Sequence, residues 1–334
     1  MVLYSQQPAL IQVEGLKMHF PISTSYFSRT KSYIHAVDGV SFTIPEGKSL
    51  ALVGESGCGK TTTGKVLTRL YAPTGGHAYL RAGDGEMVDI ACLRSNQIKL
   101  FRQRVQMIFQ DPYESLNPRM TIFDTVAEPL SVQGIGSLTD REERVAKLLD
   151  EVGLTPAGSF LFRYPHELSG GQRQRVAIAR ALVVEPDFVV ADEPTSMLDV
   201  SIRAEIMNLM MDLAAEIGIS YLYITHDLAV ARYTCQEIAV MYMGKIVEQG
   251  ATEEVLANPL HPYTQALISA VPIPDPDYRR PAPKLKGSIS KPINPPPQCR
   301  FLARCPIAAT ICQEQDHPPL EDKGSDHQAA CYLV

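Results

Sequence analysis

The segment that decides the fold is SLALVGESGCGKT, residues 49–61. Its first five residues predict a buried strand, and a helical pattern follows from Lys60. Between them, the residues from Gly54 to Thr61 match G-x-x-x-x-G-K-[ST], the pattern of a phosphate-binding loop. In such a loop backbone N–H groups turn inward on the phosphates of a nucleotide, and the next helix directs its positive end toward them. We therefore expect Lys60 to reach the β- and γ-phosphates and the Thr61 hydroxyl to ligate Mg²⁺.

Composition narrows the class of protein. The chain has 334 residues, 45% hydrophobic and 20% charged, which is typical of a globular protein and, by length, of about two domains. Its net charge of −6 has the wrong sign for a protein that binds nucleic-acid phosphates. No apolar run reaches the roughly 18 residues of a membrane helix, and the first residues lack the pattern of a secretory signal. We expect a soluble, cytoplasmic protein with no nucleic-acid partner.

Buried strands alternate with helices later in the chain. Residues 188–192 and 219–225 are short apolar strands separated by a helical stretch. This alternation predicts an α/β fold with a parallel sheet covered on both faces. The first of these strands ends in Asp192 and Glu193, where one carboxylate can hold Mg²⁺ through water and the next can polarise an attacking water. Taken alone, the pair would serve equally well as a helix cap.

Helices are predicted within residues 111–168. Thr139 and Glu142 have the spacing of a capping box, and Gly153 is placed to end that helix. This segment separates the phosphate loop from the next motif.

The sequence LSGGQ identifies the type of phosphate-loop protein; its residues are Leu168, Ser169, Gly170, Gly171 and Gln172. Ser169 and Gln172 have capping-box spacing, so a second helix is expected to open at Ser169. The phosphate loop, then LSGGQ, then the Asp-Glu strand twenty residues after Gln172 resemble the ATP-binding-cassette (ABC) ATPases. The resemblance spans about residues 10–260.

The resemblance assigns an ATP site. It implies that Asp192 is the Mg²⁺-associated acid, that Glu193 is the general base and that His226 contacts the γ-phosphate. Phe20 resembles the aromatic residue that stacks on adenine, with Tyr33 as a rival. The residues implied to bind ATP are Phe20, Gly54, Glu55, Ser56, Gly57, Cys58, Gly59, Lys60, Thr61 and Thr62.

Two further loops match the family. Gln110 is its Q-loop residue, implied to sense the nucleotide, to contribute to the Mg²⁺ site and to link the core to a helical insertion at about residues 112–168. The family uses that insertion to grip a membrane partner. Ser196 and Asp199 belong to the D-loop, where Met197 replaces the usual alanine.

The signature explains why such proteins work in pairs. Ser169 and two glycines open a helix whose N-terminus attracts anions, and one chain does not need two such ends for one triphosphate. In the family, the signature of one chain closes over ATP held by the phosphate loop of the other. Residues 168–172 are therefore expected to serve the nucleotide of a partner, and whether both composite sites are active stays open.

The C-terminal part of the sequence indicates which group of ABC ATPases the chain resembles. NPLHPYTQAL (residues 258–267), INPPPQCRFLARCP (residues 293–306) and a late His-x-x-Ala-Cys resemble the ATPase subunits of oligopeptide/dipeptide importers, although Gln298 replaces the usual glycine. The resemblance implies a peripheral ATPase on the cytoplasmic face of the membrane, forming a heterodimer with a second ABC ATPase. Two transmembrane permease subunits and an extracytoplasmic substrate-binding protein complete such an importer. Peptides are expected as substrate, with nickel chelates, glutathione and sugars as the alternatives.

Four of the seven cysteines crowd into the last 36 residues, namely Cys299, Cys305, Cys312 and Cys331. Cytoplasmic proteins rarely keep such cysteines as disulfides, so the four cysteines are expected either to ligate a metal or to have no ligand at all. The spacing lacks the close pairs of zinc sites, and four thiolates can also hold an iron–sulfur cluster. The resemblance implies a [4Fe–4S] cluster; Zn²⁺ and unligated cysteines are the alternatives.

These observations predict two domains. Residues 1–256 form an ABC nucleotide-binding domain, implied to contain a RecA-like parallel-sheet core, an antiparallel β subdomain and the helical insertion. Residues 257–334, which include a proline-dense stretch, form an importer-type extension with the cysteine cluster.

Other phosphate-loop classes fit less well. ABC ATPases of DNA repair insert long coiled-coil arms, whereas only 109 positions separate Lys60 from Ser169, with no sustained heptads. A GTPase switch lacks support because no Asn-Lys-x-Asp motif is present. A module that holds ATP without turnover is disfavoured by the intact Glu193 and His226.

Overall fold

The computed structural model describes residues 8–22, 32–271, 291–324 and 326–334. The chain divides into two units. Among the described residues, the helical unit contains residues 8–10, 45–48 and 92–223, and the phosphate-loop unit contains residues 11–22, 32–44, 49–91, 224–271, 291–324 and 326–334. Most of the proline-dense stretch predicted within residues 257–334 lies outside the described residues.

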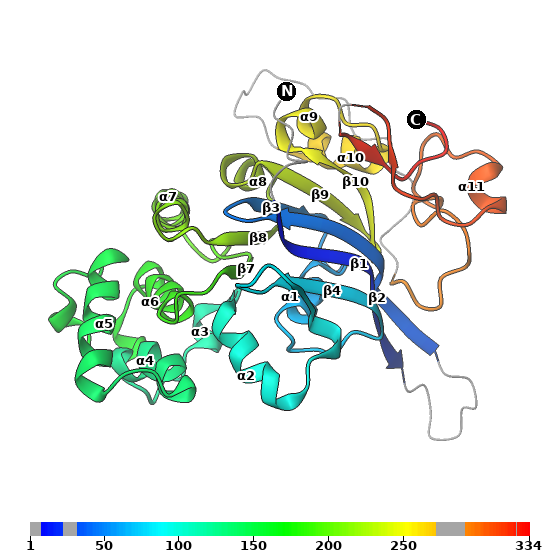
Figure 1. Ribbon diagram of the computed structural model, residues 1–334. Helices are drawn as coiled ribbons and strands as arrows, with labels where there is room; N and C mark the ends of the chain where they lie inside the picture. The colour runs from blue at the N-terminus through cyan, green and yellow to red at the C-terminus, as the bar shows by residue number, and fades with distance from the viewer. Residues whose placement is uncertain (1–7, 23–31, 272–290, 325) are drawn as a thin grey trace, which may run out of the picture. The chain divides into compact units, whose positions relative to one another are not determined.

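The phosphate-loop unit contains a four-stranded antiparallel sheet (Figure 1). Its order is β2-β1-β4-β5, with β1 (Ala9–Ile22), β2 (Ser32–Pro45), β4 (Gly75–Arg81) and β5 (Met87–Asp89). Along β1, Ile11 and Val13 are buried, and then the alternation changes phase so that Leu16 and Met18 are buried. A bulge causes the change, since Gly15 has a φ of 55° within the register shift.

The strand before the phosphate loop is buried, as predicted. β3 (Ser49–Val53) pairs in parallel with β9 (Glu237–Tyr242), and antiparallel strands continue through β10 (Lys245–Ala251), β12 (Gln328–Ala329) and β11 (Glu321–Asp322). The described helices of this unit are α1 (Lys60–Leu67), α8 (Leu228–Thr234), α9 (Thr252–Ala257), α10 (Pro262–Ala270) and α11 (Ile311–Glu314), and η2 (Ile90–Cys92) ends at the first residue of the helical unit. The C-terminal residues therefore extend the sheet that carries the phosphate loop.

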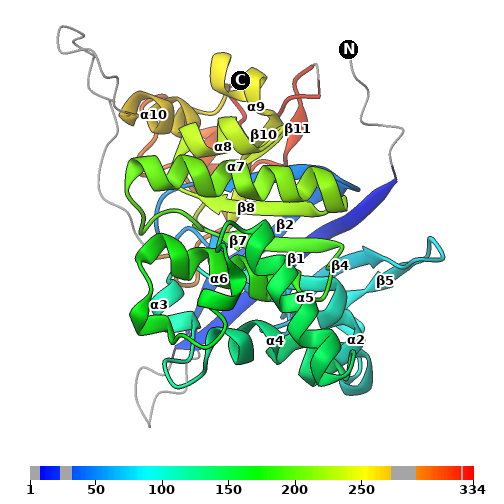
Figure 2. The same cartoon turned by 90° about the vertical axis from the view of Figure 1, so that its left-hand side faces the viewer.

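In the helical unit, the predicted parallel pairing is confirmed, since β6 (Val105–Ile108) runs parallel to β7 (Phe188–Asp192). The next strand in order is β8 (Ser220–Thr225), whose last two residues belong to the other unit. Helices α4, α5 and α6 pack together (Figure 2). The helices are α2 (Ser95–Arg104), α3 (Pro112–Ser115), α4 (Ile122–Gln133), α5 (Leu138–Glu151), η3 (Ala157–Ser159), η4 (Pro165–Glu167), α6 (Gly170–Leu182) and α7 (Val200–Ile217). None of the helices described has the length and apolarity needed to cross a membrane.

The start of α5 corrects one prediction. The Asp140 N–H donates to the Ser137 hydroxyl at 3.3 Å, and the Ser137 N–H donates to the Asp140 carboxylate at 2.8 Å. The capping box predicted for Thr139 and Glu142 is therefore wrong by two residues. Both pairs have the same spacing, but the chain turns at Gly136, whose φ is 68°, and the helix begins directly after that turn.

Candidate nucleotide site

The phosphate loop requires glycine at two of its positions. Gly59 has a φ of 116°, and a Cβ there would lie 2.0 Å from the Ala36 carbonyl oxygen. A Cβ at Gly54 would lie 2.2 Å from the Met241 carbonyl oxygen. These are the first and last glycines of the motif. The main chain of β2 and β9 lies so close to them that neither position has room for a side chain.

Lys60 lies folded back over the loop. Its Nζ donates to the carbonyl oxygens of Gly54 at 2.7 Å and Glu55 at 3.1 Å, and it lies 3.8 Å from the Cys58 sulfur. Only 5% of Lys60 is exposed. The ammonium group thus lies among the main-chain atoms of the loop, with Thr61 and Thr62 following on α1.

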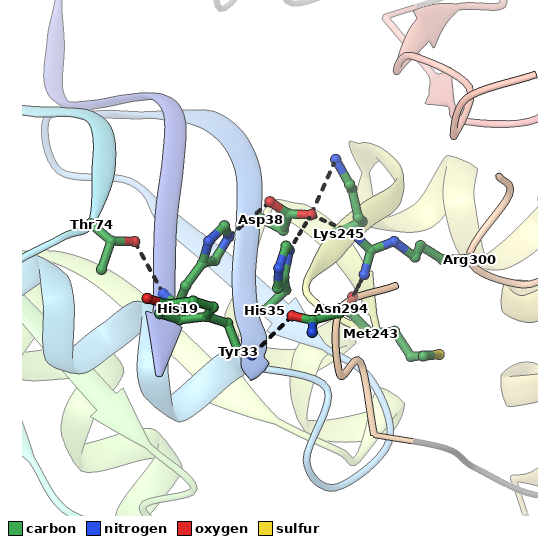
Figure 3. Close-up of polar contacts among 9 residues, drawn as sticks. All are labelled: His19, Tyr33, His35, Asp38, Thr74, Met243, Lys245, Asn294 and Arg300. Carbon is green, nitrogen blue, oxygen red and sulfur yellow. Dashed lines mark hydrogen bonds and ion pairs between the residues drawn. The ribbon is translucent and has the colours of Figure 1, made fainter. Parts of the chain in front are cut away.

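Three other predicted ATP-site residues lie in the same unit. Phe20 is on β1, with its ring edge-on to Tyr71 at 5.5 Å between centroids. Tyr33 is the second residue of β2, and its N–H donates to the Asn294 side chain at 2.9 Å (Figure 3). His226 is exposed and directly follows β8.

In the helical unit, the two carboxylates at the end of β7 have different surroundings. All five residues of β7 are buried, and Asp192 is 2% exposed. Glu193 is half-buried with a φ of 45°, a conformation that costs a non-glycine residue free energy and that recurs at functional sites. The Gln110 amide donates to the Glu193 carboxylate at 3.1 Å. The structure thus brings together the predicted Q-loop residue and the predicted base.

The D-loop turns back on the same glutamate. Ser196 donates twice to the Glu193 carbonyl oxygen, from its N–H and from its hydroxyl, each at 3.1 Å. Asp199 occupies the position before α7. Met197 is 59% exposed, so its replacement of the family's alanine does not disturb the core.

The predicted opening of the signature helix is confirmed. The Gln172 N–H donates to the Ser169 hydroxyl at 3.3 Å, and the Ser169 N–H donates to the Gln172 amide oxygen at 3.0 Å. The two glycines differ, since a Cβ on Gly170 would make an ordinary 3.7 Å contact whereas one on Gly171 would lie 2.8 Å from the Ile202 Cγ2. Gly171 is therefore also required for the packing of α6 against α7.

The four C-terminal cysteines are neighbours. The Cys299 N–H donates to the Cys312 carbonyl oxygen at 2.9 Å. Burial, and then the charges of Cys312, Cys331 and Cys305, raise the pKa of the Cys299 thiol to about 11. Among the described residues, which include all four, no three of these sulfurs lie within 4.8 Å of one another.

Sequence reasoning missed two residues that contact the phosphate loop. The Arg304 guanidinium pairs with the Glu55 carboxylate at 2.6 and 3.0 Å, and the Tyr263 hydroxyl accepts the Glu55 N–H at 2.8 Å. Both belong to the importer-type C-terminal sequences, but nothing in their spacing points to a partner 208 or 249 positions earlier.

Comparisons with known proteins identify the family. The model of the family described as ABC transporter matches residues 37–196, and the model described as Oligopeptide/dipeptide transporter, C-terminal region, matches residues 247–312. The chain is 29% identical to a solved dimer of the ATP-binding cassette MJ0796 bound to ADP and Pi, with a TM-score of 0.63 over 72% of this chain and 98% of that one. The chain belongs to the ABC family.

Two relatives define the group within that family. The chain is 44% identical over 331 residues to the oligopeptide transport ATP-binding protein AppF of Bacillus subtilis, covering 98% of both. It is 46% identical over 329 residues to the dipeptide transport ATP-binding protein DppF of Escherichia coli, covering 98% of this chain and 95% of that one. The chain therefore belongs to the oligopeptide/dipeptide transport ATP-binding proteins.

Proposed function

We propose that this chain is the ATP-hydrolysing subunit of an importer of di- and oligopeptides. The observation that carries the proposal is near full-length similarity to ATP-binding proteins of peptide transport in a chain with both a phosphate loop and a capped signature helix. The subunit would form a heterodimer with a second ABC ATPase at the cytoplasmic face of the membrane. Two permease subunits would contact the helical insertion, and an extracytoplasmic binding protein would deliver the peptide.

The residues of this chain fit the chemistry of ATP hydrolysis. Lys60 would exchange its loop carbonyl oxygens for the β- and γ-phosphates, and His226 would contact the γ-phosphate. Glu193 would accept the proton of the attacking water, and the hydrogen bond from Gln110 orients its carboxylate. Phe20 is our choice for the residue that stacks on adenine, with Tyr33 as the alternative.

The donors available for Mg²⁺ are oxygen atoms of the kind it prefers. They are the Thr61 hydroxyl, the Asp192 carboxylate through water and the Gln110 amide oxygen, which stays available because Gln110 uses its NH₂ group on Glu193. Bound Mg²⁺ would neutralise charge on the phosphates. Leu168 to Gln172 would serve the ATP of the partner, next to the D-loop residues Ser196 and Asp199.

For the cysteines we propose a [4Fe–4S] cluster, with Zn²⁺ or no metal as alternatives. Four neighbouring thiols are a suitable donor set for either metal group. One tetrahedral zinc ion, with Zn–S bonds of about 2.3 Å, would need its sulfurs about 3.8 Å apart. No three of the sulfurs of Cys299, Cys305, Cys312 and Cys331 lie within 4.8 Å of one another, so their described positions do not match that zinc geometry. We propose that residues 257–334 form the importer-type extension that follows the nucleotide-binding domain, residues 1–256. A [4Fe–4S] cluster would cross-link the last part of this extension, between Cys299 and Cys331.

Anaerobic purification tests the cluster. We expect a brown protein with broad absorbance at about 400 nm that is lost in Cys299→Ser. A colourless protein with stoichiometric zinc would support the alternative.

Co-purification from membranes tests the proposed function. The tagged full-length chain is expected to bring with it a second ABC ATPase and two permease subunits, and the complex to hydrolyse MgATP. Glu193→Gln should bind ATP without hydrolysing it, whereas Lys60→Ala should assemble the same complex without binding ATP. Isolation of the chain without any membrane companion would contradict the proposal.

A further inference from the structure

The turn between the first two C-terminal cysteines reaches the phosphate loop. Residues 299–305 form a tight turn in which the Cys305 N–H donates to the Phe301 carbonyl oxygen at 2.9 Å. From this turn, Arg304 forms two hydrogen bonds with the Glu55 carboxylate, a two-pronged pairing that fixes both groups in orientation. The Arg304 side chain is 8% exposed and that of Glu55 is 23% exposed, so water screens the pair only in part.

The main chain of Glu55 is held as well. Its N–H donates to the Tyr263 hydroxyl, and Tyr263, on α10, is fully buried. Burial raises the pKa of the Tyr263 hydroxyl, which keeps the group neutral. Hydrogen bonds thus hold Glu55, a residue of the phosphate loop, through both its side chain and its main chain.

Three aromatic rings pack around the residues that contact Glu55. The Phe301 ring lies edge-on to Tyr242 at 5.1 Å and tilted against Tyr263 at 5.5 Å. Tyr242 and Tyr263 lie 4.6 Å apart, and Phe301 is 1% exposed. The three rings join the cysteine turn, α10 and the end of β9, and the Arg304 guanidinium lies over the Tyr242 ring at 5.7 Å, so this packing fixes where Arg304 is placed.

We propose that Arg304 and Tyr263 are positioning residues of the ATP site, which act through Glu55 to hold the phosphate loop ready for the nucleotide. Ordering a glycine-rich loop costs backbone entropy, and a loop ordered in advance avoids that cost when ATP binds. The proposal rests on the proposed function in taking ATP as the nucleotide.

A second ion pair offers a matched control. Arg300 extends from the same turn and pairs with Asp38 on β2, where His19 also contacts the carboxylate at 3.0 Å and Lys245 lies 4.0 Å away (Figure 3). Although burial opposes it, Lys245 and the hydrogen bonds from the histidines, with Arg300, lower the pKa of Asp38 to about 2. This pair docks the turn without contacting a loop residue. A role in docking alone would therefore predict similar effects from Arg300 and Arg304.

The test is equilibrium titration of the full-length chain with MgATP, in a Glu193→Gln parent so that ATP is not consumed. Arg304→Gln is expected to raise the Kd about tenfold, since a charge-assisted, two-pronged pair is lost. Arg304→Lys keeps the positive charge but cannot form two parallel hydrogen bonds, so its Kd should lie between that of the parent and that of Arg304→Gln. Arg300→Gln is expected to leave the Kd within about twofold of the parent, because the Arg304 and Tyr263 contacts with Glu55 remain.

Two further measurements separate positioning from folding. Glu55→Gln removes the same ion pair by changing its phosphate-loop partner. The double variant with Arg304→Gln should then bind ATP no more weakly than either single variant. Thermal unfolding of each variant shows whether the chain is folded; if Arg304→Gln does not fold, Glu55→Gln and Tyr263→Phe carry the test.

The outcomes are distinct. A parent that does not bind MgATP refutes the proposed function together with this inference. A parent that binds, with folded Arg304→Gln or Glu55→Gln binding equally tightly, overturns the inference alone. An equal increase in the Kd for MgATP in Arg300→Gln and Arg304→Gln would also overturn the inference, because it would indicate that both arginines only dock the turn.

Discussion

Glu248→Gln is expected to destabilise the phosphate-loop unit, because this one carboxylate joins three segments. Its Oε1 accepts the Leu260 N–H at 2.7 Å and pairs with the His327 Nε2 at 2.7 Å, and its Oε2 accepts the His261 N–H at 2.9 Å. Glu248 has no exposed surface, so water cannot replace a lost partner. A glutamine must turn its NH₂ group toward at least one of these donors.

The expected loss follows from those contacts. One buried donor left unpaired costs about 1–3 kcal/mol, and the remaining hydrogen bonds weaken because the acceptor is no longer charged. Together these give about 3 kcal/mol, or a decrease of roughly 4 °C in the unfolding midpoint for a chain of this length. Thermal unfolding followed by circular dichroism measures it.

A matched substitution serves as control. Glu253 pairs with Arg232 on the surface, where both side chains are more than half exposed, so Glu253→Gln should leave the midpoint unchanged. A midpoint for Glu248→Gln within about 1 °C of the parent would refute the reasoning.

Three other outcomes are expected. Gly171→Ala should lower the free energy of unfolding by about 1–3 kcal/mol in urea titrations, because the new Cβ meets Ile202 at 2.8 Å; Ile202→Ala in the same chain should relieve the clash, and purely additive losses would contradict this. Ser169→Ala should cost about 1 kcal/mol, since it removes the cap that Gln172 completes, and an unchanged urea midpoint would contradict it. Burial lowers the pKa of His261 to about 4, below the value of about 6.5 in an unfolded chain, so the unfolded state binds an extra proton and stability should fall from pH 6.5 toward 4. His261→Asn keeps a helix cap and should reduce that pH dependence; an identical profile would contradict the assignment.

Local features were predictable from the sequence. The signature cap joins residues three positions apart, and the glycine expected to end α5, Gly153, has a φ of 78° at that place. Such features depend on neighbours along the chain, so a short pattern contains the information. The error at Ser137 has the same origin, because two overlapping pairs offered equal spacing and a glycine turn decided between them.

Long-range pairs were not predictable. Arg304 and Glu55 are 249 positions apart, and Glu248 and His327 are 79 apart. Each pairing depends on how the C-terminal residues return to the phosphate-loop unit, where β12 joins β10. No periodicity within either segment indicates its partner.

Hydrolysis by the purified importer complex tests most directly whether two chains must close over ATP. Gly170→Asp, with the equivalent change in the partner ATPase, places a carboxylate at the signature, while Gly170 itself has room for a Cβ within its own chain. We predict that MgATP still binds and that hydrolysis is lost. Hydrolysis at the parent rate would contradict the account.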